Sequence, residues 1–158
     1  MSTTTAPRPA ALDRDTAMHL AATEYDRFAA VLRTLRAEDW TRSTDCPAWD
    51  VRAVAGHVLG MARMVATVRA FVAQNAGAAR AGGGIDALTG LQVRQAAHLT
   101  PDELVQDVTS VAPRAVRGRR RLSAVLGRLT LPEDQVVAGR TERWTFGFLF
   151  DVVLTRDT

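Results

Sequence analysis

The residue best placed to do chemistry in this sequence is His57, which follows a short loop and a predicted helix start. It stands three residues after Val54 and four before Met61, which puts it within about 40–60° of both on a regular helix. The imidazole is therefore expected to be at least half buried. Two interpretations stay open: a core-edge histidine bonded to a neighbouring helix, which the periodicity alone favours, and a metal ligand or catalytic group.

A carboxylate near the chain end is the second candidate. Asp157 continues an apolar stripe formed by Phe146, Phe150 and Val153. A carboxylate on such a face is costly unless it is paired or binds a cation. The alternative is a solvated aspartate at a frayed helix end. The residues alone do not decide between the two.

Helical periodicity predicts the elements that would position these two side chains. The expected helices cover residues 13–36, 51–75, 85–98, 101–126 and 146–158, and Thr145 is the expected cap of the last one. Asp50 is the expected N-cap of the helix that carries His57, and a valine-rich seam follows it from Val51 to Val72. Thr100 and Glu103 form a capping-box pattern at the start of the 101–126 helix, and Pro113 predicts a kink or break inside it.

The expected architecture is an all-α four-helix bundle with long connections and one short extra helix. Residues 1–12 are expected to be a flexible tail, and residues 13–158 one domain. The segments 37–49, 77–84 and 128–143 are predicted to be loops or links, and no strand pattern is evident.

Composition restricts the classes of function. The hydrophobic share of 47% is enough for a core, and no apolar run approaches the roughly 20 residues of a membrane helix. The single cysteine, Cys46, allows no intrachain disulfide, and its expected role is packing. These observations favour a cytoplasmic protein. All 20 basic residues are arginines, and the cluster at 114–128 lacks interleaved aromatic residues, so nucleic-acid binding is not favoured.

The segment WTRSTDCPAWDVRAVAGHVLGMARMV is similar to a known family pattern: Trp, a short polar run, Cys-Pro-Ala-Trp, Val-Arg and a helical His. It resembles the N-terminal metal-binding domain of the mycothiol-dependent maleylpyruvate isomerase family, which belongs to the DinB/YfiT-like superfamily. The C-terminal segment WTFGFLFDVVLTRDT resembles one subgroup of that family. The resemblance implies the DinB-like four-helix bundle.

The resemblance also implies a divalent metal, usually zinc, held by a histidine and by an acid-x-x-x-His pair on the last helix. Carried over, His57 is the first ligand and Asp157 takes the acid position. The final histidine would fall four residues after Asp157, whereas the sequence ends at Thr158. The third ligand and any C-terminal domain are therefore expected to be missing from this chain, with weakened metal binding as the result.

The implied activity is metal-assisted activation of mycothiol, followed by isomerisation or by transfer of the thiol to an electrophilic substrate. Two interpretations stay open for Arg52, Arg63 and Arg156: they hold substrate carboxylates, or they lie on solvated helix faces. No catalytic residue is assigned. The alternative is a non-catalytic helical interaction or dimerisation module that has lost its metal site, and the sequence leaves open whether the chain is an enzyme. A shortened last helix also favours pairing with a second copy.

Overall fold

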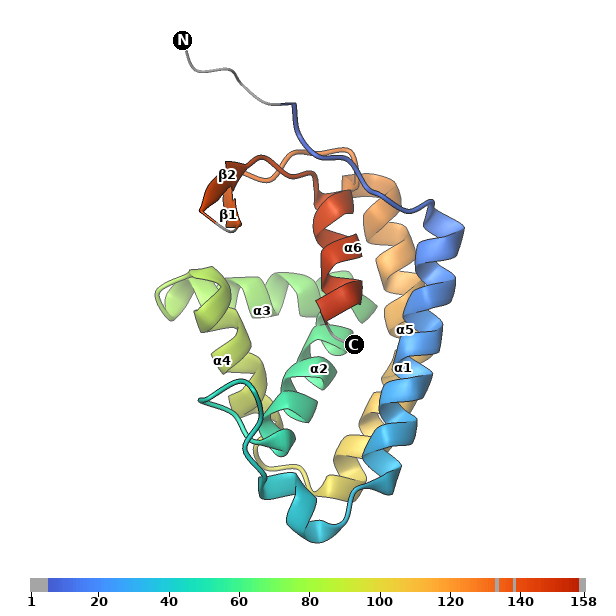
Figure 1. Cartoon of the computed structure of the whole chain (residues 1–158), viewed down its shortest axis with the longest axis vertical. Helices are drawn as coiled ribbons and strands as arrows, with labels where there is room; N and C mark the ends of the chain where they lie inside the picture. Colours follow the sequence, from blue (N-terminus) through green and yellow to red (C-terminus); the bar gives the residue numbers. More distant parts are fainter. Residues whose placement is uncertain (1–5, 133, 138, 157–158) are drawn as a thin grey trace. The chain divides into compact units, whose positions relative to one another are not determined.

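The computed structural model describes residues 6–132, 134–137 and 139–156, with residues 152–156 as backbone only. The chain is mostly helical, which confirms the all-α class (Figure 1). The described elements are α1 (Arg14–Thr34), the 3-10 helix η1 (Ala37–Thr41), α2 (Val51–Ala66), α3 (Val68–Arg80), α4 (Gly84–Ala96), α5 (Pro101–Leu126), β1 (Gln135–Val137), β2 (Arg140–Glu142) and α6 (Phe146–Arg156).

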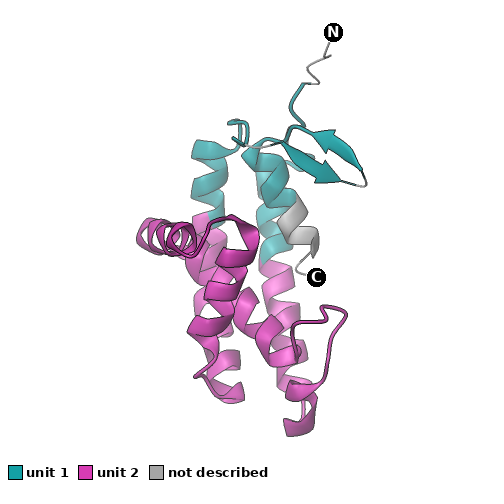
Figure 2. Ribbon diagram, turned by 90° about the vertical axis from the view of Figure 1, so that its left-hand side faces the viewer, with its two compact units in different colours: residues 1–21, 119–158 teal, residues 22–118 magenta. Residues whose placement is uncertain are grey.

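The chain divides into two compact units, residues 22–118 and residues 1–21 with 119–158 (Figure 2). In the first unit α3 leads away from the end of α2, and α4 returns beside α2 (Figure 1). Its core contains Leu59 of α2 and two α5 residues, Leu104 and Val108, all fully buried. Burying such side chains is worth about 1.5–3 kcal/mol each and is the main source of stability in this unit.

The predicted helix 51–75 is two helices. α2 ends at Ala66, and Thr67 lies in an extended conformation that caps α3 by accepting a hydrogen bond from Ala70 N at 3.1 Å. The valine seam consequently does not continue: Val68 and Val72 are 74% and 59% exposed. An N-cap threonine supplies a partner for an unpaired helix N–H, and here it marks a break that apolar spacing alone concealed.

α5 was predicted with its observed bounds. Thr100 N and Oγ1 donate to Glu103 Oε2 at 2.7 and 2.8 Å, and Glu103 N donates back to Thr100 Oγ1 at 3.3 Å. This capping box fixes the start of the helix. The expected break at Pro113 does not occur, since α5 is helical from Pro101 to Leu126 and the proline ring is exposed.

The second unit joins the first described residues to α6. Arg8 N donates to Arg143 O at 2.8 Å, and Thr145 N donates to Arg8 O at 3.0 Å. The carboxylate of Asp151, which is 9% exposed, accepts from Ala11 N at 2.7 Å and from Leu12 N at 3.2 Å. Residues 8–12 are thus hydrogen-bonded, although we expected a flexible tail there.

The stretch 128–143, expected to be a loop, holds a short antiparallel hairpin of β1 and β2, with Val136 opposite Thr141. Gly139 takes a positive φ of 75° at its turn, a conformation that glycine adopts without strain. Thr145 caps α6 as predicted, accepting from Phe148 N at 3.2 Å. Within the described part of the chain, no helix combines the length and apolar character that crossing a bilayer requires.

Candidate metal centre

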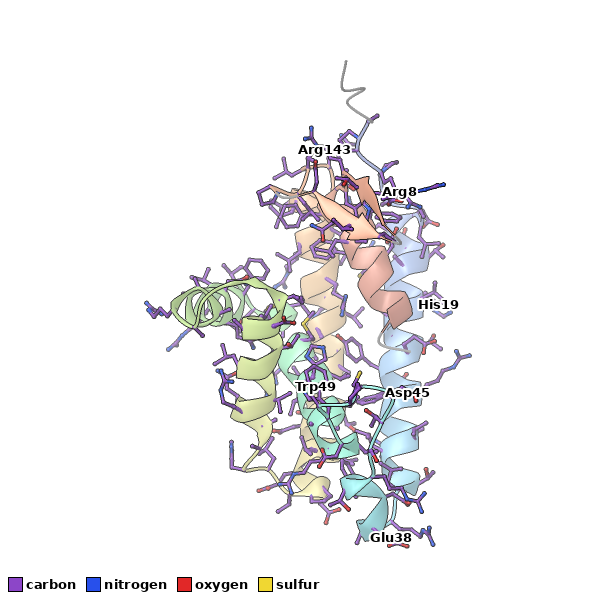
Figure 3. The ribbon with its side chains drawn as sticks, turned by 60° about the vertical axis from the view of Figure 1, so that its left-hand side comes forward. Arg8, His19, Glu38, Asp45, Trp49 and Arg143 are labelled. Carbon is purple, nitrogen blue, oxygen red and sulfur yellow. The ribbon has the colours of Figure 1, made fainter. Side chains whose placement is uncertain are left out.

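His57 lies in the second turn of α2 and is half-buried, as its spacing predicted. Asp50 caps this helix by accepting a hydrogen bond from Ala53 N at 2.8 Å. The cap fixes the residue at which α2 begins, and therefore the helical face on which His57 lies. The ring of Trp49 packs on the imidazole with centroids 5.2 Å apart and planes tilted by 43°. Figure 3 shows Trp49 at the end of the loop, beside the first turns of α2.

The loop before α2 is tied down by its own hydrogen bonds. Trp49 N donates to Cys46 O at 2.9 Å, and Thr44 Oγ1 donates to Trp49 O at 2.9 Å. Val51 N donates to Arg42 O at 3.0 Å. These contacts hold the Trp49 ring on His57, while Cys46 itself is exposed. The loop therefore positions an aromatic cover for the histidine.

Two glutamines that the sequence analysis did not single out support the imidazole. His57 Nδ1 and Gln92 Oε1 of α4 are 2.8 Å apart. Gln92 Nε2 donates to Gln74 Oε1 of α3 at 2.9 Å, and Gln74 Nε2 donates to Gly60 O at 3.1 Å. Gln92 is completely buried and Gln74 is 6% exposed. Nδ1 is thus engaged by the protein, which leaves Nε2 as the ring nitrogen able to bind a metal.

Close contact between α2 and α4 makes this bond possible. A Cβ atom added at Gly60 would lie 2.5 Å from Gln92 Cβ, and one at Gly56 would lie 2.9 Å from Ala96 Cβ. Real Cβ atoms do not approach other carbons so closely, because ordinary contacts are about 3.5–4.0 Å. The two glycines lie on either side of His57 in the sequence, at positions 56 and 60. Two glycines four residues apart beside a histidine are the sequence signal that could have predicted a close helix approach there.

The second predicted ligand, Asp157, lies outside the described residues. Over the described ranges, no three His, Cys, Asp or Glu side chains gather closely enough to hold a metal ion. Asp151, a described acid on α6, accepts from two backbone N–H groups, so its carboxylate already serves a structural role. His57 therefore fits the role of a metal ligand by orientation, and the described residues supply no complete donor set.

Two of the three arginines expected to bind substrate carboxylates, Arg52 and Arg63, have structural partners, and the side chain of Arg156 lies outside the described residues. Arg52 Nη2 donates to Leu99 O and, at 3.2 Å, to Ala97 O, and Arg63 forms a salt bridge with Asp107. A cavity of about 300 Å³ lies beside Arg52 and is otherwise lined by Asp50, Ala53, Val93, Ala96 and Ala97. Ala53 and Ala96 are one helical turn away from His57 and Gln92, respectively. Because Arg52 is already bonded to two carbonyls and Asp50 caps α2, we assign no carboxylate site to this cavity.

The arginine cluster on α5 is divided by the fold. Arg119 is 3% exposed, and Arg120 Nη2 forms a salt bridge with Asp15 Oδ1 at 2.6 Å. Arg114, Arg117 and Arg121 are exposed. Arg128 is exposed as well, so the fold buries one arginine of the cluster and pairs another with Asp15.

Residues 21–154 match the family model described as the mycothiol maleylpyruvate isomerase N-terminal domain. This range is most of the chain, and it contains the loop before α2, His57 and both glutamines. No curated protein and no solved structure gave a match.

Proposed function

This chain belongs to the family of the mycothiol maleylpyruvate isomerase N-terminal domain, and we propose that it forms part of a divalent metal site that activates a low-molecular-weight thiol. The observation that carries the proposal is the contact between His57 Nδ1 and the buried Gln92 Oε1 at 2.8 Å. Histidines that bind metals commonly donate their second ring N–H to a fixed acceptor, which orients the ring and raises its basicity.

In this proposal His57 Nε2 and the Asp157 carboxylate are the ligands from this chain, and zinc is the expected metal. Groups outside the described residues complete the donor set, since catalytic zinc usually has three protein ligands and one exchangeable position. When bound, the metal lowers the pKa of the thiol, so that a thiolate is available at neutral pH. The proposed reaction class is thiol addition to an activated double bond, giving isomerisation, or thiol transfer to an electrophile, with mycothiol as the thiol.

The described residues contribute orientation and water exclusion. Gln92 holds Nδ1 of His57, and the Trp49 ring covers one side of the imidazole. An aromatic cover lowers the local dielectric and strengthens electrostatic interactions at the ring.

The test is zinc binding measured by titration calorimetry on the purified chain. We expect His57→Ala and Asp157→Ala each to weaken binding at least tenfold. His98→Ala removes an exposed histidine and is the matched control, expected to bind like the wild-type chain. Wild-type protein that binds no zinc, or a His57→Ala protein that binds as tightly as wild type, would contradict the proposal.

One observation favours the alternative function, a non-catalytic interaction or dimerisation module without a metal. α3 exposes Val68 and Val72, which lie four residues apart and so on one helical face. Sedimentation equilibrium with the wild-type chain and a Val68→Ser, Val72→Ser double variant tests it. Self-association that the double variant abolishes, in a chain that binds no zinc, would replace the metal proposal by this one.

A further inference from the structure

A chain of hydrogen bonds runs from His57 through two buried glutamines and returns to the helix on which it starts. It leaves α2 at His57, passes through Gln92 of α4 and Gln74 of α3, and ends on the carbonyl of Gly60, three residues after His57. We propose that this relay of Gln92 and Gln74, anchored on Gly60 O, holds His57 as the Nδ1–H tautomer and so keeps Nε2 free to bind a metal.

The Gly60 carbonyl sets the direction of the relay, because a carbonyl oxygen only accepts hydrogen bonds. Gln74 therefore turns its amide nitrogen toward Gly60 and its oxygen toward Gln92. Gln92 must then donate to Gln74, and its Nε2 also lies 3.3 Å from Met61 Sδ, a weak acceptor. Its Oε1 is left facing His57 and only accepts, so Nδ1 carries the proton.

Burial makes this direction difficult to reverse. With Gln92 completely buried and Gln74 6% exposed, water cannot replace a lost partner. Reversing both amides would set Gln74 Oε1 against Gly60 O, and reversing one would set two like groups against each other. Leaving a buried polar group without a partner disfavours the reversed arrangement by roughly tenfold or more.

The relay also explains a second role for Gly60. Its missing side chain admits Gln92 to the α2 surface, and its carbonyl orients Gln74. Gln92 and Gln74 are positioning residues in this view, because neither would be a metal ligand. The consequence for metal binding rests on the proposed function, whereas the tautomer of His57 does not.

The test is the tautomer of His57 in the metal-free protein, read from the two imidazole ¹⁵N chemical shifts at a pH where the ring is neutral. We expect the wild-type chain to show a protonated Nδ1. Gln74→Met removes the donor to Gly60 without touching His57, so the Gln92 amide can turn and the Nε2–H tautomer should become populated. Gln106→Met makes the same change at an exposed glutamine of α5 and should leave the shifts unchanged.

A second variant tests the acceptor itself. Gln92→Leu keeps a side chain of similar size but leaves His57 Nδ1 without its acceptor, so the Nε2–H tautomer should become populated there too. If Gln74→Met does not fold by circular dichroism, Gln74→Leu replaces it. A wild-type His57 found as the Nε2–H tautomer, or a folded residue-74 variant with unchanged shifts, would overturn the relay.

Zinc titration of the same variants distinguishes the relay from the proposed function. A lost hydrogen bond behind a ligating histidine typically weakens metal binding about 10–100-fold, and we expect that loss for Gln74→Met but not for Gln106→Met. If the tautomer shifts as expected while the wild-type chain binds no zinc, the relay stands and the metal proposal fails. If the wild-type chain binds zinc but the tautomer of His57 is unchanged in the residue-74 variant, the metal proposal stands and the relay fails.

Discussion

Gly60→Ala tests how closely α2 and α4 must approach at the candidate site. The new Cβ would lie 2.5 Å from Gln92 Cβ and 2.6 Å from Gln92 Cγ. These atoms belong to the inner part of a fully buried side chain, so they cannot swing away as the end of an exposed side chain would. Either the two helices separate or Gln92 leaves its position, and both outcomes break the bonds to Gln74 and His57.

The magnitude follows from three opposing effects on the free energy of unfolding. Replacing a helix-interior glycine by alanine contributes about 1 kcal/mol of stability through helix propensity. Overpacking costs about 1–3 kcal/mol, and a buried amide left without its partner costs a further 1–3 kcal/mol or so. We therefore expect a net destabilisation of about 3 kcal/mol, or a fall in Tm of roughly 6–12 °C in a chain of this size.

The assay is urea denaturation followed by circular dichroism, with Gly90→Ala as the matched control. Gly90 lies inside α4, where an added Cβ meets only Arg94 Nη1 at 3.1 Å, the movable end of a side chain. Propensity should dominate there, and the control should gain about 0.5–1 kcal/mol. A Gly60→Ala protein as stable as Gly90→Ala would refute the reasoning from helix approach.

The remaining predictions concern α5. Gly118→Ala should destabilise by about 1–3 kcal/mol in the same assay, because its Cβ would lie 1.8 Å from the backbone oxygen of Val65, which cannot move without distorting α2; unchanged stability would contradict this. Hydrogen bonds from Thr100 N–H and then its hydroxyl lower the pKa of Glu103 from its ordinary 4.5. The ionised Glu103 carboxylate therefore stabilises the folded state fully above pH 4.5, and this stabilisation is lost as the pH falls through the lowered pKa. Glu103→Gln should consequently make the free energy of unfolding fall less steeply with decreasing pH in this acid range.

Local signals predicted the helices whose ends are set by nearby residues. Thr100, Pro101 and Glu103 fixed the start of α5, and Asp50 fixed the start of α2. The prediction that the His57 helix continues to residue 75 was wrong, because Val68 and Val72 keep an apolar helical spacing although they face solvent. The hairpin was missed because three-residue strands with mostly exposed side chains leave no alternation to detect.

The candidate site was predictable only in part for a similar reason. The half-buried position of His57 follows from its spacing on one helix. Its partners Gln92 and Gln74 lie 35 and 17 residues further along the chain, on two other helices. Which glutamines become buried together depends on how α3 and α4 return to α2, and that return is set by the close approach at Gly60, not by local propensity. The metal role of Asp157 stays a prediction.

The contacts between residues 8–12 and the region around α6 have a consequence for the order of folding. Ala11 N and Asp151 are 140 residues apart in sequence, and Arg8 and Thr145 are 137 apart. Pairings this distant form after local helices, because the entropy of closing the intervening loop must be overcome first. During synthesis residues 8–12 therefore leave the ribosome early. They cannot form their hydrogen bonds to the α6 region until the sequence up to Asp151 has also been synthesised and has emerged.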